Sequence, residues 1–130
     1  MRNYQRTKSN PYLLPHNVYM ICLYLVRDYE RIKSEMDDIL HTYPSSQPDG
    51  LPHGTDITDT TAKRAIKLEE LSKKCEIIEQ AIIIVPCEYR KGILKNINYN
   101  YPYPITAHRN TYGYWKSKFL YQIAYNSNLI

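Results

Sequence analysis

PCEYRKGILKNINYNYPYPITAHRNTYGYWKSKFLYQIAYNSNLI, residues 86–130, is the stretch that decides the fold of this chain. Apolar residues recur at helical spacing in both of its halves. The YPYP segment at 101–104 stops a helix, because each proline favours extended geometry in the residue before it. We therefore expect two helices joined by a turn. The second begins after Thr106 or at Asn110, and Asn110 or Thr111 is the expected N-cap.

Each helix of this pair has an apolar side. The first is expected from Cys87 to Ile97 and contains Gly92, which costs up to ~1 kcal/mol relative to alanine in a helix, so we expect a neighbouring helix to cross closely there. On the second helix Trp115, Phe119 and Ile123 share one face and are the expected core anchors. The polar and aromatic opposite flank of that helix is then left to solvent.

Two longer helices are expected upstream. Apolar residues recur at three- and four-residue steps from Pro15 to His41 and again from Asp59 or Thr60 to Val85, where residues 68–85 form a short heptad seam. Residues 44–58 between them are rich in proline and glycine and predict a long loop. Sequential helices usually neighbour each other, so we expect an antiparallel hairpin, although such a seam also suits pairing with a second subunit.

The sequence thus predicts an all-α fold, in which a long antiparallel helical hairpin is followed by a C-terminal helix-turn-helix. Its expected parts are a flexible basic arm at 1–14, the hairpin at 15–85 and the helix-turn-helix at 86–130. Charge is distributed unevenly: residues 1–9 carry +3, residues 10–85 carry −4 and residues 86–130 carry +5, which sum to +4. Local positive fields attract phosphates, although basic ends also serve solubility alone.

A basic and aromatic helix pair of this size is a candidate reader of double-stranded DNA. A recognition helix needs one apolar face that fixes it on a scaffold and one polar, aromatic and positive face that enters the major groove. The expected phosphate contacts are Lys91, Lys95, Arg109 and Lys118, and the expected base contacts are Asn110, Tyr114 and Ser117. Lys116 lies beside the apolar face and is a weaker candidate. The alternative is that tyrosines on a helix serve as surface or protein-interface residues.

Signals for catalysis, metal binding and membrane insertion are weak. The four histidines are scattered, and the adjacent Asp37 and Asp38 point about 100° apart on a helix, so they do not converge. Cys22, Cys75 and Cys87 lack paired metal-ligand spacing, and the first two are expected to be small buried hydrophobes. We expect no enzymatic activity, no cofactor, no metal and no membrane partner, and a cytoplasmic protein without a signal peptide.

A set of short segments carries a family resemblance. They are EYRKGIL at 88–94, YPYP at 101–104, AHRNT at 107–111, Trp115-Lys116, Phe119, PHNVY at 15–19, RDY at 27–29, PDG at 48–50 and Gly54-Thr55. In these segments the chain resembles small phage and prophage transcriptional regulators of the RinA/ArpU type from low-GC Gram-positive bacteria. The resemblance implies a regulator of phage late genes in a bacterial host cell, with a C-terminal helix-turn-helix related to the promoter-reading domain of sigma factors. It also implies that residues 110–117 face DNA and that the hairpin contacts RNA polymerase or a second copy of the chain.

Two classes of function are therefore open at the level of sequence. One is a sequence-specific DNA-binding transcription regulator, with double-stranded DNA, RNA polymerase and a second copy of the chain as partners. The other is a non-enzymatic helical interaction protein, in which the hairpin forms a homodimer or docks on a partner such as RNA polymerase, or a DNA-packaging adaptor. The interaction-protein alternative predicts little DNA binding and loss of assembly on Leu71→Asp.

Overall fold

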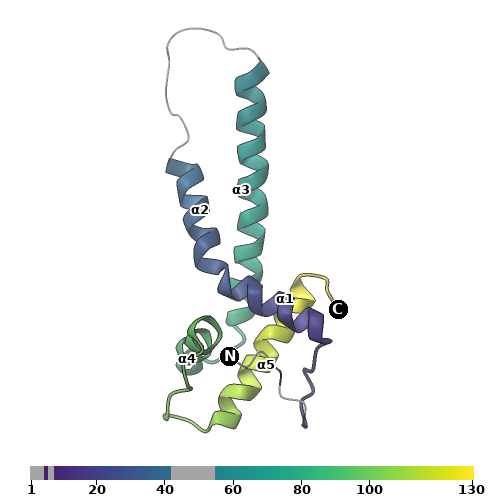
Figure 1. The fold of residues 1–130 in the computed structure, drawn as a ribbon, viewed down its shortest axis with the longest axis vertical. Coiled ribbons are helices and arrows are strands. Elements are labelled where there is room, and N and C mark those ends of the chain that lie inside the picture. Colours follow the sequence, from purple (N-terminus) through teal and green to yellow (C-terminus); the bar gives the residue numbers. More distant parts are fainter. Residues whose placement is uncertain (1–4, 6–7, 42–54) are drawn as a thin grey trace. The chain divides into compact units, whose positions relative to one another are not determined.

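The computed structural model of the protein describes residue 5, residues 8–41 and residues 55–130, the last range without the side chains of 55–59. Every regular element in these residues is an α-helix, so the expected all-α fold is confirmed for them (Figure 1). In chain order the helices are α1 (His16–Arg27), α2 (Tyr29–His41), α3 (Thr55–Ile82), α4 (Cys87–Tyr99) and α5 (Arg109–Asn126). Most of the predicted 44–58 loop lies outside the described residues, and α3 already begins within it.

α1 and α2 stand in place of the single helix predicted from Pro15 to His41. Asp28 separates them, with its backbone at φ −89° and ψ −4° and its N–H bonded to the carbonyls of Tyr24 (2.9 Å) and Leu25 (3.2 Å). The prediction of one continuous helix is wrong at this residue. Aspartate is a weak helix former in an interior position, because its side chain competes for backbone hydrogen bonds. The apolar spacing nevertheless continues across it, so periodicity alone gives no sign of the break.

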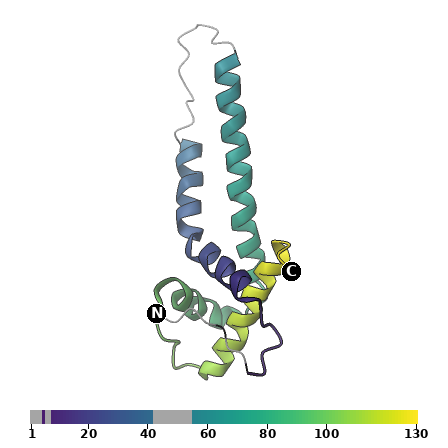
Figure 2. The same ribbon diagram turned by 45° about the vertical axis from the view of Figure 1, so that its right-hand side comes forward.

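Contacts divide the chain into two units, one of residues 1–28 with 77–130 and the other of residues 29–76. These units differ from the expected hairpin at 15–85 and helix-turn-helix at 86–130. In the first unit α1, α4 and α5 pack against one another (Figure 2). Its core consists of buried apolar side chains from all three helices, among them Leu23, Ile93 and Phe119. α1 therefore supplies part of the scaffold that carries α5.

Asn100, in the left-handed conformation (φ 58°, ψ 30°), ends α4, and its N–H bonds to the Asn96 carbonyl at 2.9 Å.

α4 and α5 approach each other closely at Gly92. A Cβ atom on Gly92 would lie 2.8 Å from Cδ of Pro104 and 2.9 Å from Cε1 of Tyr112. The expected close approach is thus confirmed, with Tyr112 of α5 as the neighbour. It explains why a residue that weakens helices lies in the middle of α4.

Three tyrosines pack together at this junction. The Tyr112 ring is 1% exposed and lies between Tyr89, which it meets edge-on at 5.2 Å between ring centroids, and Tyr103, on which it stacks at 5.1 Å. Its hydroxyl is 2.9 Å from Thr106 Oγ1. Because the rings come from α4, the connection and α5, they fix the position of α5 on its scaffold.

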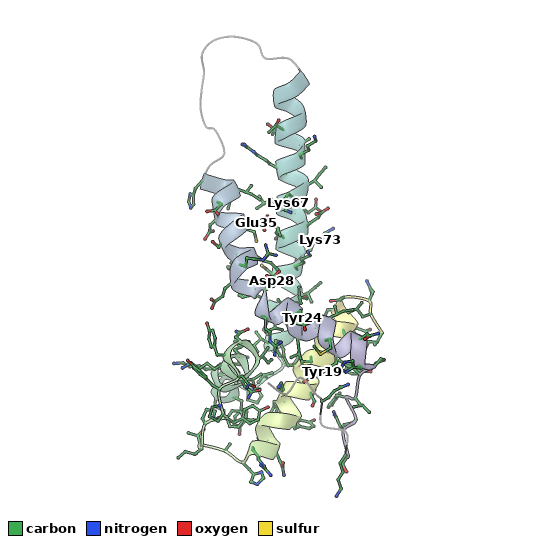
Figure 3. All side chains as sticks on the ribbon, in the orientation of Figure 1. Tyr19, Tyr24, Asp28, Glu35, Lys67 and Lys73 are labelled. Carbon is green, nitrogen blue, oxygen red and sulfur yellow. The ribbon has the colours of Figure 1, made fainter. Side chains whose placement is uncertain are left out.

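In the second unit α2 lies beside α3, and the first turns of α3 extend beyond the end of α2 (Figures 1 and 2). Glu35 of α2 faces Lys67 of α3, with an O–N distance of 3.6 Å (Figure 3). Farther along, the Cys75 thiol lies 3.8 Å from the Met36 sulfur. Leu71, in the predicted heptad seam, is only 4% exposed. This part of the seam is therefore already covered within one chain.

Candidate functional site

α5 has one buried face and one accessible face, rotated from the expected arrangement. Phe119 and Ile123 are fully buried, as predicted. Trp115 is only half-buried, so its prediction as a core anchor is wrong. At 100° per residue the buried side centres on Tyr112, Lys116 and Ile123, and position 115 lies roughly a quarter turn away from that centre. The prediction that the apolar indole is buried therefore shifts the expected core face by one residue from the observed one.

The first turn of α5 is capped by a residue that the sequence does not favour for this role. His108 is the N-cap, and its Nδ1 accepts a hydrogen bond of 3.0 Å from the backbone N–H of Asn110. The prediction of Asn110 or Thr111 as N-cap is wrong, because the helix begins at Arg109. Arg109 and Asn110 consequently lie inside the first turn, and both side chains are exposed.

The three residues expected to contact bases lie together. Asn110, Tyr114 and Ser117 line one cavity of about 320 Å³ along the accessible face of α5. Tyr114 is 39% exposed, whereas Ser117 is half-buried. Short polar groups and one aromatic ring therefore share a concave surface at the start of this helix.

Part of this face is covered by the N-terminal segment. Asn10 Nδ2 donates a hydrogen bond of 3.4 Å to Ser117 Oγ, and the Tyr12 ring packs edge-on against Tyr114 (5.8 Å) and Tyr121 (5.4 Å). A hydrogen bond with Tyr114, followed by desolvation, raises the pKa of Tyr12. The described part of the predicted arm thus contacts α5, while residues 1–4 and 6–7 lie outside the described residues. The flexibility of the arm as a whole stays a prediction.

Lys118 is less accessible than a phosphate contact usually is. Its Nζ lies 5.9 Å from the centre of the Tyr12 ring and 5.2 Å from that of Trp115, and the residue is half-buried. Both rings attract its ammonium through cation–π interactions. Tyr12 is therefore a residue of this face that sequence reasoning missed, since a single tyrosine in a polar segment carries no signal of a contact with α5.

The α4 cations are arranged differently from those of α5. Lys91 and Lys95 are exposed, and neither lines the cavity beside Ser117 or the one beside Lys116. Arg90, which precedes Lys91, donates hydrogen bonds to the carbonyls of Val85 (2.7 Å) and Ile83 (3.1 Å). It therefore caps the end of the preceding segment.

Lys116 lies on the buried side of α5. Its Nζ donates a hydrogen bond of 2.8 Å to Asn96 Oδ1 of α4. Burial, and then the positive Arg27 of α1, lower the pKa of this ammonium from 10.5 to about 8. Lys116 and Arg109 line a second cavity, of about 490 Å³. The sequence signal for this burial is its position four residues from both Tyr112 and Leu120.

Outside these cavities, the described residues were compared with the requirements of metal sites and membrane-spanning helices. Within residues 8–41 and 60–130 no group of three or more His, Cys, Asp or Glu is placed to hold a metal ion. Cys22 and Cys75 are buried, as predicted, and Cys87 is exposed. None of the described helices is long and apolar enough to cross a membrane. Comparison of the chain with protein-family models, curated proteins and solved structures finds no match.

Proposed function

We propose that the chain is a double-stranded-DNA-binding transcription regulator of the phage or prophage type. The observation that carries this proposal is the division of α5 into a face buried on α1 and α4 and a face where Asn110, Tyr114 and Ser117 share a cavity. A recognition helix has this division, because it must be fixed on a scaffold while short polar groups reach base edges. Arg109 and Lys118, which flank these residues in the sequence, add positive charge to α5.

The packing of α1, α4 and α5 also supports a helix-turn-helix role for the last two helices. In such modules three helices share one core, and the last one enters the major groove. The connection of nine residues between Tyr99 and Arg109 is longer than the usual turn of this motif. The aromatic contacts of Tyr112 compensate for this length by fixing α5 on α4.

On this proposal the cations supply most of the affinity and the α5 cavity supplies the preference for sequence. Four phosphate contacts, from Lys91, Lys95, Arg109 and Lys118, would weaken binding by roughly a hundredfold between about 50 and about 200 mM salt. The N-terminal segment would join the interface, since Asn10 and Tyr12 already lie on α5.

Fluorescence anisotropy with labelled duplexes tests the proposal at both salt concentrations. The probes are random duplexes and fragments of the chain's own genomic neighbourhood. Lys118→Ala should weaken binding to every duplex, and Asn110→Ala should mainly reduce the preference for one fragment. Lys73→Ala, which removes an exposed amine of α3, is the matched control. Absence of binding at low salt, or equal effects of Asn110→Ala on all duplexes, would contradict this assignment of roles.

We propose further that α2 and α3 form the antiparallel hairpin expected from the sequence, which contacts RNA polymerase or a second copy in the bacterial cytoplasm. Exposed apolar side chains favour such a contact: Leu40 of α2 is 56% exposed and Ile66 of α3 is 58% exposed. Leu71→Asp is a poor test of assembly, because Leu71 is buried within the chain and its charge would destabilise the fold.

This contact is also the basis of the second candidate function, a helical interaction protein without DNA binding. Ile66→Asp separates the two, since it changes an exposed residue. Sedimentation over a range of concentrations should show assembly lost in Ile66→Asp and retained in Lys73→Ala. A chain that is monomeric at all concentrations and binds DNA would exclude the homodimer.

A further inference from the structure

The cavity beside Lys116 shares Asn110 and Ser117 with the proposed DNA interface, but its innermost charged group, Lys116, has no role in that interface. It has a volume of about 490 Å³, which falls within the range of small-molecule sites. Its walls come from Gln5 of the N-terminal segment and from α1, α4, the connection and α5, all in the unit of residues 1–28 and 77–130. The site therefore lies within one packed unit.

The charges around this cavity are positive. Lys116 and Arg109 line it, and none of the described residues that line it is Asp or Glu. The neighbouring charge that acts most on Lys116 is Arg27, which disfavours the ammonium form. Lys116 does bond to Asn96, but a neutral amide oxygen does not balance its charge. A half-buried cation beside other cations is stabilised by an anionic partner, since an uncompensated charge is costly away from water.

The donors that line the cavity fit a phosphate group. Arg109 presents a planar guanidinium that binds two oxygens at once, and Lys116 presents a compact charge with three donors. The side-chain amides of Asn100 and Asn110 also line the wall, whereas the amide of Asn96 accepts from Lys116 and donates to the Tyr101 carbonyl at 2.8 Å. Two cations with several neutral donors match a phosphomonoester, which carries nearly two negative charges above about pH 7 and has three terminal oxygens.

We propose that this cavity binds the phosphate group of a small phosphomonoester, with Lys116 and Arg109 as its cationic partners. The Tyr103 ring, which lines the same cavity, provides an apolar wall for the organic part of the ligand. The proposal does not rest on the proposed DNA binding, since the charges and donors of this cavity would bind a phosphate group whether or not the chain binds DNA.

Binding of the anion should be coupled to protonation of Lys116. The titratable or charged groups around this amine are Tyr19 and Arg27 of α1, Tyr103 of the connection and Arg109 of α5. Burial raises the pKa of Tyr103 to about 12, and it also raises that of Tyr19. Neither tyrosine therefore ionises between about pH 7 and about pH 9. Over this interval the affinity should fall roughly tenfold, because free Lys116 loses its proton while a bound phosphate would retain it.

Isothermal titration calorimetry with the full chain tests the proposal. The probes are phenyl phosphate, inorganic phosphate and, as the uncharged control, phenol. Phenyl phosphate should bind with one site per chain, take up a proton at about pH 8.5 and bind more weakly as the pH rises. Lys116→Met should weaken binding tenfold or more. Arg109→Gln should also weaken binding tenfold or more, and it leaves the core intact because Arg109 is exposed. Lys118→Met, outside the cavity, should bind as the wild type does.

Three results would overturn the proposal. The first is the absence of saturable binding of phenyl phosphate or inorganic phosphate at millimolar concentration. The second is unchanged affinity in both Lys116→Met and Arg109→Gln. The third is binding of phenol as tight as that of phenyl phosphate, since the cavity would then hold the ring and not the phosphate group. Failure of duplex binding leaves the proposal standing, so the two proposals fail separately.

Discussion

Lys116 should make the stability of this protein rise with pH between about 7 and about 9. The pKa of its ammonium is about 8 in the folded chain and 10.5 in the ordinary state of a lysine. Between these values the unfolded chain binds more protons than the folded chain, so the free energy of unfolding increases with pH. Burial is the main cause, because the ammonium loses water that one hydrogen bond to Asn96 does not replace.

The expected size of this effect follows from the two pKa values. Between about pH 7 and about pH 9 the free energy of unfolding should increase by roughly 1.3 kcal/mol, and residual water around the ammonium reduces this toward about 1 kcal/mol. At higher pH two other groups oppose the increase. Burial raises the pKa of Cys22 from 9.0 to about 11 and that of Tyr103 from 10.0 to about 12. The free energy of unfolding therefore decreases as the pH rises through each of these two intervals.

Urea denaturation followed by circular dichroism, at half-unit steps of pH, measures this dependence. Lys116→Met keeps the volume of the side chain and removes the amine, so its free energy of unfolding should lack the increase. Cys22 and Tyr103 are present in both proteins, and their contributions cancel in the difference. Lys91→Met controls for the loss of one exposed positive charge. Equal pH slopes in the wild type and in Lys116→Met would refute the assignment of the lowered pKa to Lys116.

Three further predictions concern the packing around α4 and α5. Gly92→Ala should destabilise the fold by about 1–3 kcal/mol in urea denaturation, despite its better helix propensity, because the new methyl group meets the rigid Pro104 ring and the buried Tyr112; a more stable variant would show that these rings move aside. Tyr112→Phe should cost about 1 kcal/mol, the contribution of the hydroxyl contact with Thr106, whereas Tyr112→Ala should cost about 3–5 kcal/mol, and equal losses would show that the ring contacts stabilise the fold less than the hydroxyl does. A thiol reagent should modify Cys87 rapidly in the native chain, and Cys22 and Cys75 only after denaturation; rapid reaction of all three would contradict their burial.

The elements that the sequence predicts well are those set by local chemistry. Pro86 precedes the first residue of α4, and the YPYP segment lies in the connection between α4 and α5, because proline restricts its neighbours wherever it occurs. Gly92 signals a close approach for the same kind of reason, since its helix cost must be offset elsewhere. The break at Asp28 is different, because α1 packs on α4 and α5, and no local pattern records that packing.

The candidate site also has features that local sequence predicts and features that depend on packing between distant segments. The helical wheel predicts that Asn110, Tyr114 and Ser117 share a side of α5, and they line one cavity. The cover over that side could not be predicted, since Asn10 and Ser117 are separated by 107 positions in the chain. The altered pKa of Lys116 likewise depends on burial by several elements.

The two proposed ligands are linked through the wall that their cavities share. Asn110, Gly113 and Ser117, which lie three and four residues apart on α5, line both cavities. A phosphomonoester beside Lys116 would therefore place negative charge one side chain away from the surface proposed for DNA, whose phosphates are also negative. Such a ligand would weaken DNA binding, and by linkage DNA would weaken the binding of the ligand by the same factor. If both proposals hold, α5 is the DNA-recognition helix, and it is also the element through which a small phosphate compound lowers the affinity for DNA.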